Sequence, residues 1–96
     1  MHKNKELKIW QRAMDWEVNL YELTSQLPQD EKFGLKSQLR RCAVSVPSNI
    51  AEGAGRSTNK QFQAYLQVAI GSCNEAVTQF ELTHRLHLAE RNNCNR

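Results

Sequence analysis

The stretch LKSQLRRCAVSVPSNIAEGAGR, residues 35–56, decides how this chain folds. Its apolar residues recur every three or four positions, the spacing of one helical face: Leu35, Leu39, Cys42, Ala43, Val46 and Ile50. We therefore expect a helix over about 34–54. Pro47 lies inside it and predicts a kink or a break, because proline lacks an N–H and its ring clashes with the preceding turn. Gly53 and Gly55 predict the end of the helix, since glycine accepts positive φ angles.

The segments on either side carry the same periodicity. Upstream we expect a helix over about 6–27, ended by Pro28. Downstream we expect one over about 58–88, where Thr58 and Gln61 have the spacing of a capping box. The polar residues 91–96 are expected to fray. The fold class is therefore all-α: an up-and-down antiparallel helical bundle of three long helices, forming one domain over residues 1–96.

The upstream helix carries two adjoining apolar stripes, each with one tryptophan. One stripe is Leu7, Trp10, Met14, Val18 and Tyr21; the other is Ile9, Ala13, Trp16, Leu20, Leu23 and Leu27. One stripe suffices to dock a helix on its own domain, so two suggest burial on more than one side. A 96-residue chain has a small core, and three cysteines without a CxxC pair do not make a disulfide framework. We therefore expect support from further copies of the chain.

Composition excludes some cellular settings. No apolar run approaches the roughly 18 residues of a membrane span, and the basic start MHKNKELKIW is not followed by the apolar run of a signal peptide. A reduced, cytoplasmic protein with no membrane partner is the expectation.

Basic residues gather in the middle of the chain. Six of them lie between positions 32 and 60, against the single acid Glu52: Lys32, Lys36, Arg40, Arg41, Arg56 and Lys60. This stretch is therefore more basic than the chain as a whole, whose net charge is +3. A solvated helix face is one interpretation. The other is a surface for nucleic acid, whose field would add up over the copies of an oligomer and whose affinity would depend strongly on salt.

A polar stripe interrupts the apolar pattern of the second and third helices. Its members are Arg41, Ser45, Asn49 and Glu52 on one helix and Ser72, Glu75 and Gln79 on the next. Paired polar stripes fix the register of helices, either within a bundle or between subunits. Because no histidine accompanies Ser45 in this pattern, we expect no catalytic residues and no enzyme activity.

Two further motifs are weak. Residues 53–58, GAGRST, lack P-loop spacing and predict a helix connector, at most with an anion near Arg56 and Lys60. Glu81 and His84 form one half of a di-iron motif without its second half. A zinc site on His84, His87 and Cys94 would be opportunistic, so we expect no metal and no cofactor.

The string at 35–56, with Gly71-Ser72 and Glu75, resembles the signature of the four-helix-bundle proteins encoded in intervening sequences of bacterial 23S rRNA genes. The resemblance covers about residues 7–88. That family is similar to the accessory protein of diversity-generating retroelements, a basic pentamer that binds nucleic acid and a reverse transcriptase. The resemblance implies a homopentamer with basic faces toward nucleic acid, the candidate contacts being Lys36, Arg40, Arg41, Arg56 and Lys60.

The resemblance also bears on the number of helices. Relatives continue into a fourth helix, whereas this sequence stops soon after the third. Either a short fourth element is missing or a neighbouring subunit covers the exposed stripe. The leading hypothesis is a non-enzymatic homo-oligomer that binds RNA or DNA without sequence specificity. The alternative is a protein-interaction scaffold or an accessory subunit of a polymerase or reverse transcriptase.

Overall fold

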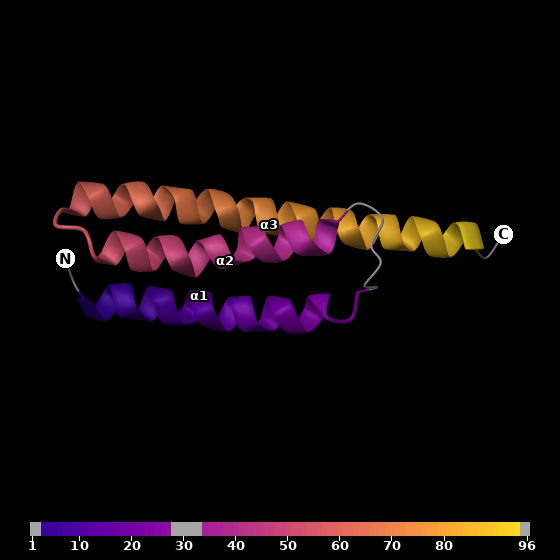
Figure 1. The fold of residues 1–96 in the computed structure, drawn as a ribbon, viewed down its shortest axis with the longest axis horizontal. Helices are drawn as coiled ribbons and strands as arrows, with labels where there is room; N and C mark the ends of the chain where they lie inside the picture. The colour runs from indigo at the N-terminus through magenta and orange to yellow at the C-terminus, as the bar shows by residue number, and fades with distance from the viewer. Residues whose placement is uncertain (1–2, 28–33, 95–96) are drawn as a thin grey trace.

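The computed structural model describes residues 3–27 and 34–94, with side chains over residues 6–27 and 34–86. These residues form three helices: α1 (Lys3–Thr24), α2 (Leu35–Ala54) and α3 (Asn59–Cys94). The described ranges contain no strand, so the all-α prediction is confirmed. Figure 1 shows an elongated bundle in which α2 runs opposite to α1 and α3, with extents of 58 × 20 × 16 Å. Helix α2 packs against both of the others.

Two predicted helix ends differ from the structure. Helix α1 ends at Thr24, three residues before the predicted end, and Pro28 lies outside the described residues. Helix α3 continues to Cys94, so the tail expected to fray from residue 91 is helical up to that cysteine. The local sequence AERNNC contains no proline or glycine, and nothing in it stops a helix that is already formed.

Of the two glycines that follow the SVPSNIAE string, Gly55 ends α2 as predicted and Gly53 does not. Helix α2 is a single helix through the buried Pro47 and includes Gly53, so Pro47 does not break it and Gly53 does not end it. A Cβ atom on Gly53 would lie 2.7 Å from Tyr65 Cβ and 2.9 Å from Phe62 Cδ1. Gly53 therefore lies at a point where α2 and α3 approach each other closely. Gly55 caps α2 with φ −81°, in the right-handed region.

The connection into α2 uses a left-handed residue instead. Gly34, which precedes α2, has φ 65°, a conformation that residues with a Cβ rarely adopt. At the other end of α2, the predicted cap of α3 is confirmed: Thr58 Oγ1 accepts a hydrogen bond from the Gln61 N–H at 3.1 Å.

The core lies along α2 in two apolar clusters shared by all three helices. The first cluster consists of Ala13, Val46, Ile50 and Ala69, packed by Trp10, Trp16, Leu66 and Cys73. The second consists of Leu20, Leu39, Ala43 and Ala76, packed by Trp16, Cys42 and Phe80. On α1, the stripe with Ala13 and Leu20 thus faces the core. The other stripe leaves Leu7 62 %, Val18 53 % and Tyr21 43 % exposed in a single copy.

None of the helices in the described part of the chain has the length and apolarity needed to cross a membrane.

Candidate nucleic-acid interface and polar seam

Arg40 faces α1. Its Nε donates to Thr24 Oγ1 at 2.8 Å, and its Nη2 donates to the Tyr21 carbonyl at 3.0 Å. The guanidinium also lies over the Tyr21 ring, 4.3 Å from its centroid. Arginine near a helix C-terminus satisfies carbonyls that have no helical donor and opposes the negative end of the dipole. Arg40 therefore fastens the end of α1 to α2.

The two neighbouring cations of α2 lie in different environments. Lys36, one turn before Arg40, is half-buried, whereas Arg41 is exposed. Successive residues of a helix point about 100° apart, so Arg40 and Arg41 cannot serve the same face. Of these three predicted contacts, Arg41 has the most accessible side chain.

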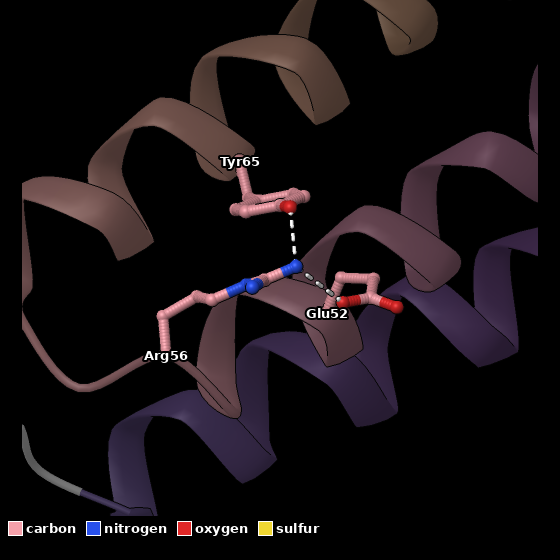
Figure 2. A network of polar contacts seen from close by, with 3 residues as sticks. All are labelled: Glu52, Arg56 and Tyr65. Atoms are coloured by element: carbon pink, nitrogen blue, oxygen red, sulfur yellow. Dashed lines mark hydrogen bonds and ion pairs between the residues drawn. The ribbon is translucent and has the colours of Figure 1, made fainter.

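Arg56 lies in the connector between α2 and α3 (Figure 2). Its Nη2 donates to Tyr65 Oη at 2.6 Å and to Glu52 Oε2 at 3.1 Å. The guanidinium also stacks on the Tyr65 ring, 4.9 Å from the centroid. Arg56 thus joins the end of α2 to the beginning of α3.

The basic cluster of the sequence does not become one patch on a single copy. Lys36, Arg40 and Arg41 lie in the first two turns of α2. Arg56 follows the other end of α2, and the exposed Lys60 lies in the first turn of α3. Lys36 and Arg56 are twenty positions apart along one helix direction, which is roughly 30 Å at 1.5 Å per residue.

A network of short polar side chains joins α2 to α3, and we call Cys42, Ser45, Asn49, Ser72 and Glu75 the polar seam. Ser45 Oγ and Ser72 Oγ lie 2.8 Å apart. Asn49 Nδ2 donates to Ser45 Oγ at 2.9 Å and to the Ser45 carbonyl at 2.7 Å. The predicted stripe therefore comes together between two helices of one chain. Glu52 is outside the seam because it pairs with Arg56.

The polar seam also holds a thiol that is kept protonated. Cys42 Sγ donates to the Ser72 carbonyl at 3.1 Å. Burial, followed by the hydrogen bond and charge of Glu75, raises the pKa of Cys42 to about 11. The two serine hydroxyls are bound to each other, and Ser45 Oγ also accepts a hydrogen bond from Asn49 Nδ2. This arrangement stabilises the contact between the helices rather than activating a nucleophile.

A shallow cavity of about 370 Å³ opens over the polar seam. It is lined by Gln38, Arg41, Cys42, Ser45, Ser72, Glu75 and Gln79. Its lining includes one cationic and one anionic side chain, Arg41 and Glu75, so it is not purely an anion site.

Within the described side chains, no group of three or more histidine, cysteine, aspartate or glutamate residues could hold a metal ion. Glu81, from the predicted half-motif, accepts a hydrogen bond from Arg85 Nε at 2.9 Å, and this bond lowers the pKa of Glu81. The side chains of His87 and Cys94 lie outside the described residues.

Sequence reasoning missed part of this geometry. The four-residue spacing of Glu52 and Arg56 was a readable signal for an ion pair. The Arg56–Tyr65 and Arg40–Thr24 contacts join different segments of the chain, so the spacing of residues within one helix does not predict them. Lys8 and Arg12, four apart on α1, are two further exposed cations outside the cluster that the sequence emphasised.

A protein-family model described as 23S rRNA-intervening sequence protein matches residues 5–96. No curated protein matches the chain. The family match covers both sides of the polar seam and all five predicted cationic contacts.

Proposed function

The chain belongs to the family of 23S rRNA-intervening sequence proteins, and from this premise we propose that it is a non-enzymatic homo-oligomer that binds RNA or DNA through a basic surface. The observation that carries the proposal is the pair of exposed cations Arg41 and Lys60, within a chain of net charge +3. Both side chains are accessible to phosphates, whereas the guanidinium groups of Arg40 and Arg56 already have protein partners.

Surface area supports self-association. Large apolar side chains are exposed on both outer helices: Leu7, Ile9, Val18 and Leu23 on α1, and Val68, Ile70 and Val77 on α3 are all at least 40 % exposed. Apolar faces of this kind mark surfaces that bind another protein chain. A pentamer, the assembly that the resemblance implies, would cover such faces.

Self-association would also bring together more cations than a single copy carries on one surface. In one copy, Arg41 and Lys60 lie near opposite ends of α2. Repetition around an oligomer places several such cations on one assembly, where their potentials add. Binding of this kind uses the phosphate backbone and is independent of base sequence.

The test is fluorescence anisotropy of labelled single-stranded RNA and DNA titrated with the protein. We expect the logarithm of the binding constant to fall linearly with the logarithm of salt concentration from about 50 mM to about 200 mM. The double variant Arg41→Ala/Lys60→Ala should bind more weakly and with a shallower slope. Arg85→Ala, which removes one charge near the other end of α3, is the control and should behave as the wild type. No binding at about 50 mM salt would refute the proposal.

A second candidate is favoured by the apolar groove between α1 and α3. A cavity of about 240 Å³ is lined there by Trp16, Leu20, Leu23, Ala76, Val77, Phe80 and Glu81. Such a groove suits an amphipathic helix of another protein. If the chain is an accessory subunit, that helix would belong to a polymerase or reverse transcriptase. Co-purification with such an enzyme from the native host, together with no affinity for nucleic acid alone, would favour this second candidate.

The proposal locates the protein in the cytoplasm. Cys42 and Cys73, whose side chains are described, are both unpaired thiols, as is usual in a reducing compartment.

A further inference from the structure

Glu17 is a buried carboxyl group on the face of α1 that packs into the bundle. It is only 8 % exposed, and neither of its carboxyl oxygens has a hydrogen-bond partner among the described residues. A buried carboxylate without a partner is strongly unfavourable, and such groups are normally neutral or paired. Consistent with this, burial raises the pKa of Glu17 above the ordinary value of 4.5.

Helix α2 contains a main-chain carbonyl group that lacks its usual helical donor. Pro47 lies inside the helix and is buried. Because proline has no N–H, the main-chain carbonyl four residues earlier, that of Ala43, loses its usual helical donor. The proline ring and the carbonyl that it leaves without a donor lie on the same side of a helix. A donor from a neighbouring helix on that side would satisfy the carbonyl.

The pairing of α1 with α2 brings Glu17 and Pro47 to the same level along the bundle. Helices α1 and α2 are antiparallel (Figure 1), and Arg40 contacts Thr24. Glu17 lies seven residues before Thr24 and Pro47 seven residues after Arg40, and seven residues are close to two helical turns. Glu17 and Pro47 therefore lie at about the same level of the two helices, and both are buried. The core clusters agree: Leu20 packs in one with Ala43, and Ala13 in the other with Val46.

We infer that Glu17 enters the fold as the neutral acid and donates its carboxyl proton to the Ala43 carbonyl, replacing the hydrogen bond that Pro47 removes. Deprotonation would set a carboxylate against a carbonyl, two acceptors without a proton between them. The contact between α1 and α2 is therefore weakened by a rise in pH.

Among the side chains that the structure describes, desolvation by burial is the cause that shifts the pKa of Glu17, with no contribution from a cation. The two residues of α2 named above at this level, Ala43 and Pro47, are not ionisable. The nearest cation of α2, Arg40, is two turns away and is bound to Thr24 and Tyr21. The ionisable groups that remain are the phenol of Tyr21, one turn along α1, and the thiol of Cys73, which reaches the core from α3. Neither supplies a positive charge.

The direction of the pH effect follows from linkage. An acid whose pKa is raised in the folded state contributes its stability at low pH and loses it as pH rises through the folded value. The melting temperature of the wild-type chain should therefore fall as pH rises above the ordinary glutamate value of 4.5 and through the raised pKa of Glu17. Glu17→Gln, whose amide donates without ionising, should remove this component of the fall. Glu22→Gln, on the exposed side of α1, is the matched control and should keep the wild-type slope.

A second measurement needs no substitution. The ¹³C chemical shift of the Glu17 carboxyl group, followed through a pH titration of the wild-type chain, should show that this group loses its proton above the ordinary glutamate value of 4.5. Ionisation of Glu17 at or below that value would overturn the inference. So would a Glu17→Gln variant that melts with the wild-type pH dependence.

Discussion

The Nε of Arg40 donates a hydrogen bond to Oγ1 of Thr24 across 2.8 Å, at the point where α1 ends against α2. Thr24 is 0 % exposed, so this is a contact with a buried hydroxyl. The same guanidinium reaches the Tyr21 carbonyl, which makes Arg40 a two-point attachment of one helix to the next. Lysine carries the charge but not the planar fork that such an attachment uses.

Arg40→Lys should therefore lower the free energy of unfolding by about 1–2 kcal/mol, because one of the two hydrogen bonds is lost. Arg41→Lys, at the exposed neighbouring position, should stay within about 0.5 kcal/mol of the wild type. Urea denaturation monitored by circular dichroism measures both. Equal stability of the two variants would show that Arg40 does not fasten α1.

Two glycines make opposite predictions for the same substitution. Gly53→Ala places a Cβ 2.7 Å from Tyr65 Cβ, so α2 and α3 must separate, and we expect a loss of about 1–3 kcal/mol. In Gly71→Ala the new Cβ meets nothing within 4 Å of this chain, and alanine is the better helix former by about 1 kcal/mol. Thermal unfolding of dilute samples measures both. A destabilised Gly71→Ala together with an unaffected Gly53→Ala would contradict the observed helix approach.

The hydrogen bond between Ser45 and Ser72 predicts coupling across the polar seam. Ser45→Ala and Ser72→Ala should each destabilise the fold, and the double variant should cost less than the sum of the two. The coupling energy expected for one hydrogen bond between neutral groups is about 0.5–1.5 kcal/mol. A double-mutant cycle from urea unfolding measures it. A strictly additive cycle would mean that the two hydroxyls, 2.8 Å apart in the structure, do not stabilise each other.

Cys42 should be a slow nucleophile. The reactive species is the thiolate, and a pKa of about 11 leaves very little thiolate at pH 8. Iodoacetamide should therefore modify Cys42 far more slowly in the folded chain than in the same chain unfolded by urea. Mass spectrometry of the Cys42 peptide over time checks this. Equal rates in both states would show that burial and Glu75 do not hold the thiol protonated.

Local patterns and contacts between helices differ in how far the sequence predicted them. Apolar periodicity located the three helices, and Thr58 with Gln61 located the start of α3, because both signals act within one or two turns. The purpose of Gly53 was missed, since it depends on Phe62 and Tyr65 of another helix. The end of α3 was missed because polar residues without a breaker do not reveal where a helix stops.

In the candidate site, too, local patterns were predicted from the sequence better than contacts between helices. Spacing alone placed Ser45 and Asn49 on one face, and the pairing of that face with Ser72 followed once both helices were antiparallel. The cationic residues form a cluster in the sequence, but the adjacent Arg40 and Arg41 point about 100° apart: Arg40 contacts Thr24 of α1, whereas Arg41 is exposed. Sequence proximity does not imply a shared surface when the residues lie on a helix.

Whether several copies of the chain associate is tested by its mass in solution, measured by light scattering with size-exclusion chromatography in low and in moderate salt. The proposed nucleic-acid surface depends on cations repeated over several copies, so we expect a mass that is a defined multiple of 11.1 kDa. A mass of 11.1 kDa at all concentrations would contradict it, because Arg41 and Lys60 of one copy lie near opposite ends of α2.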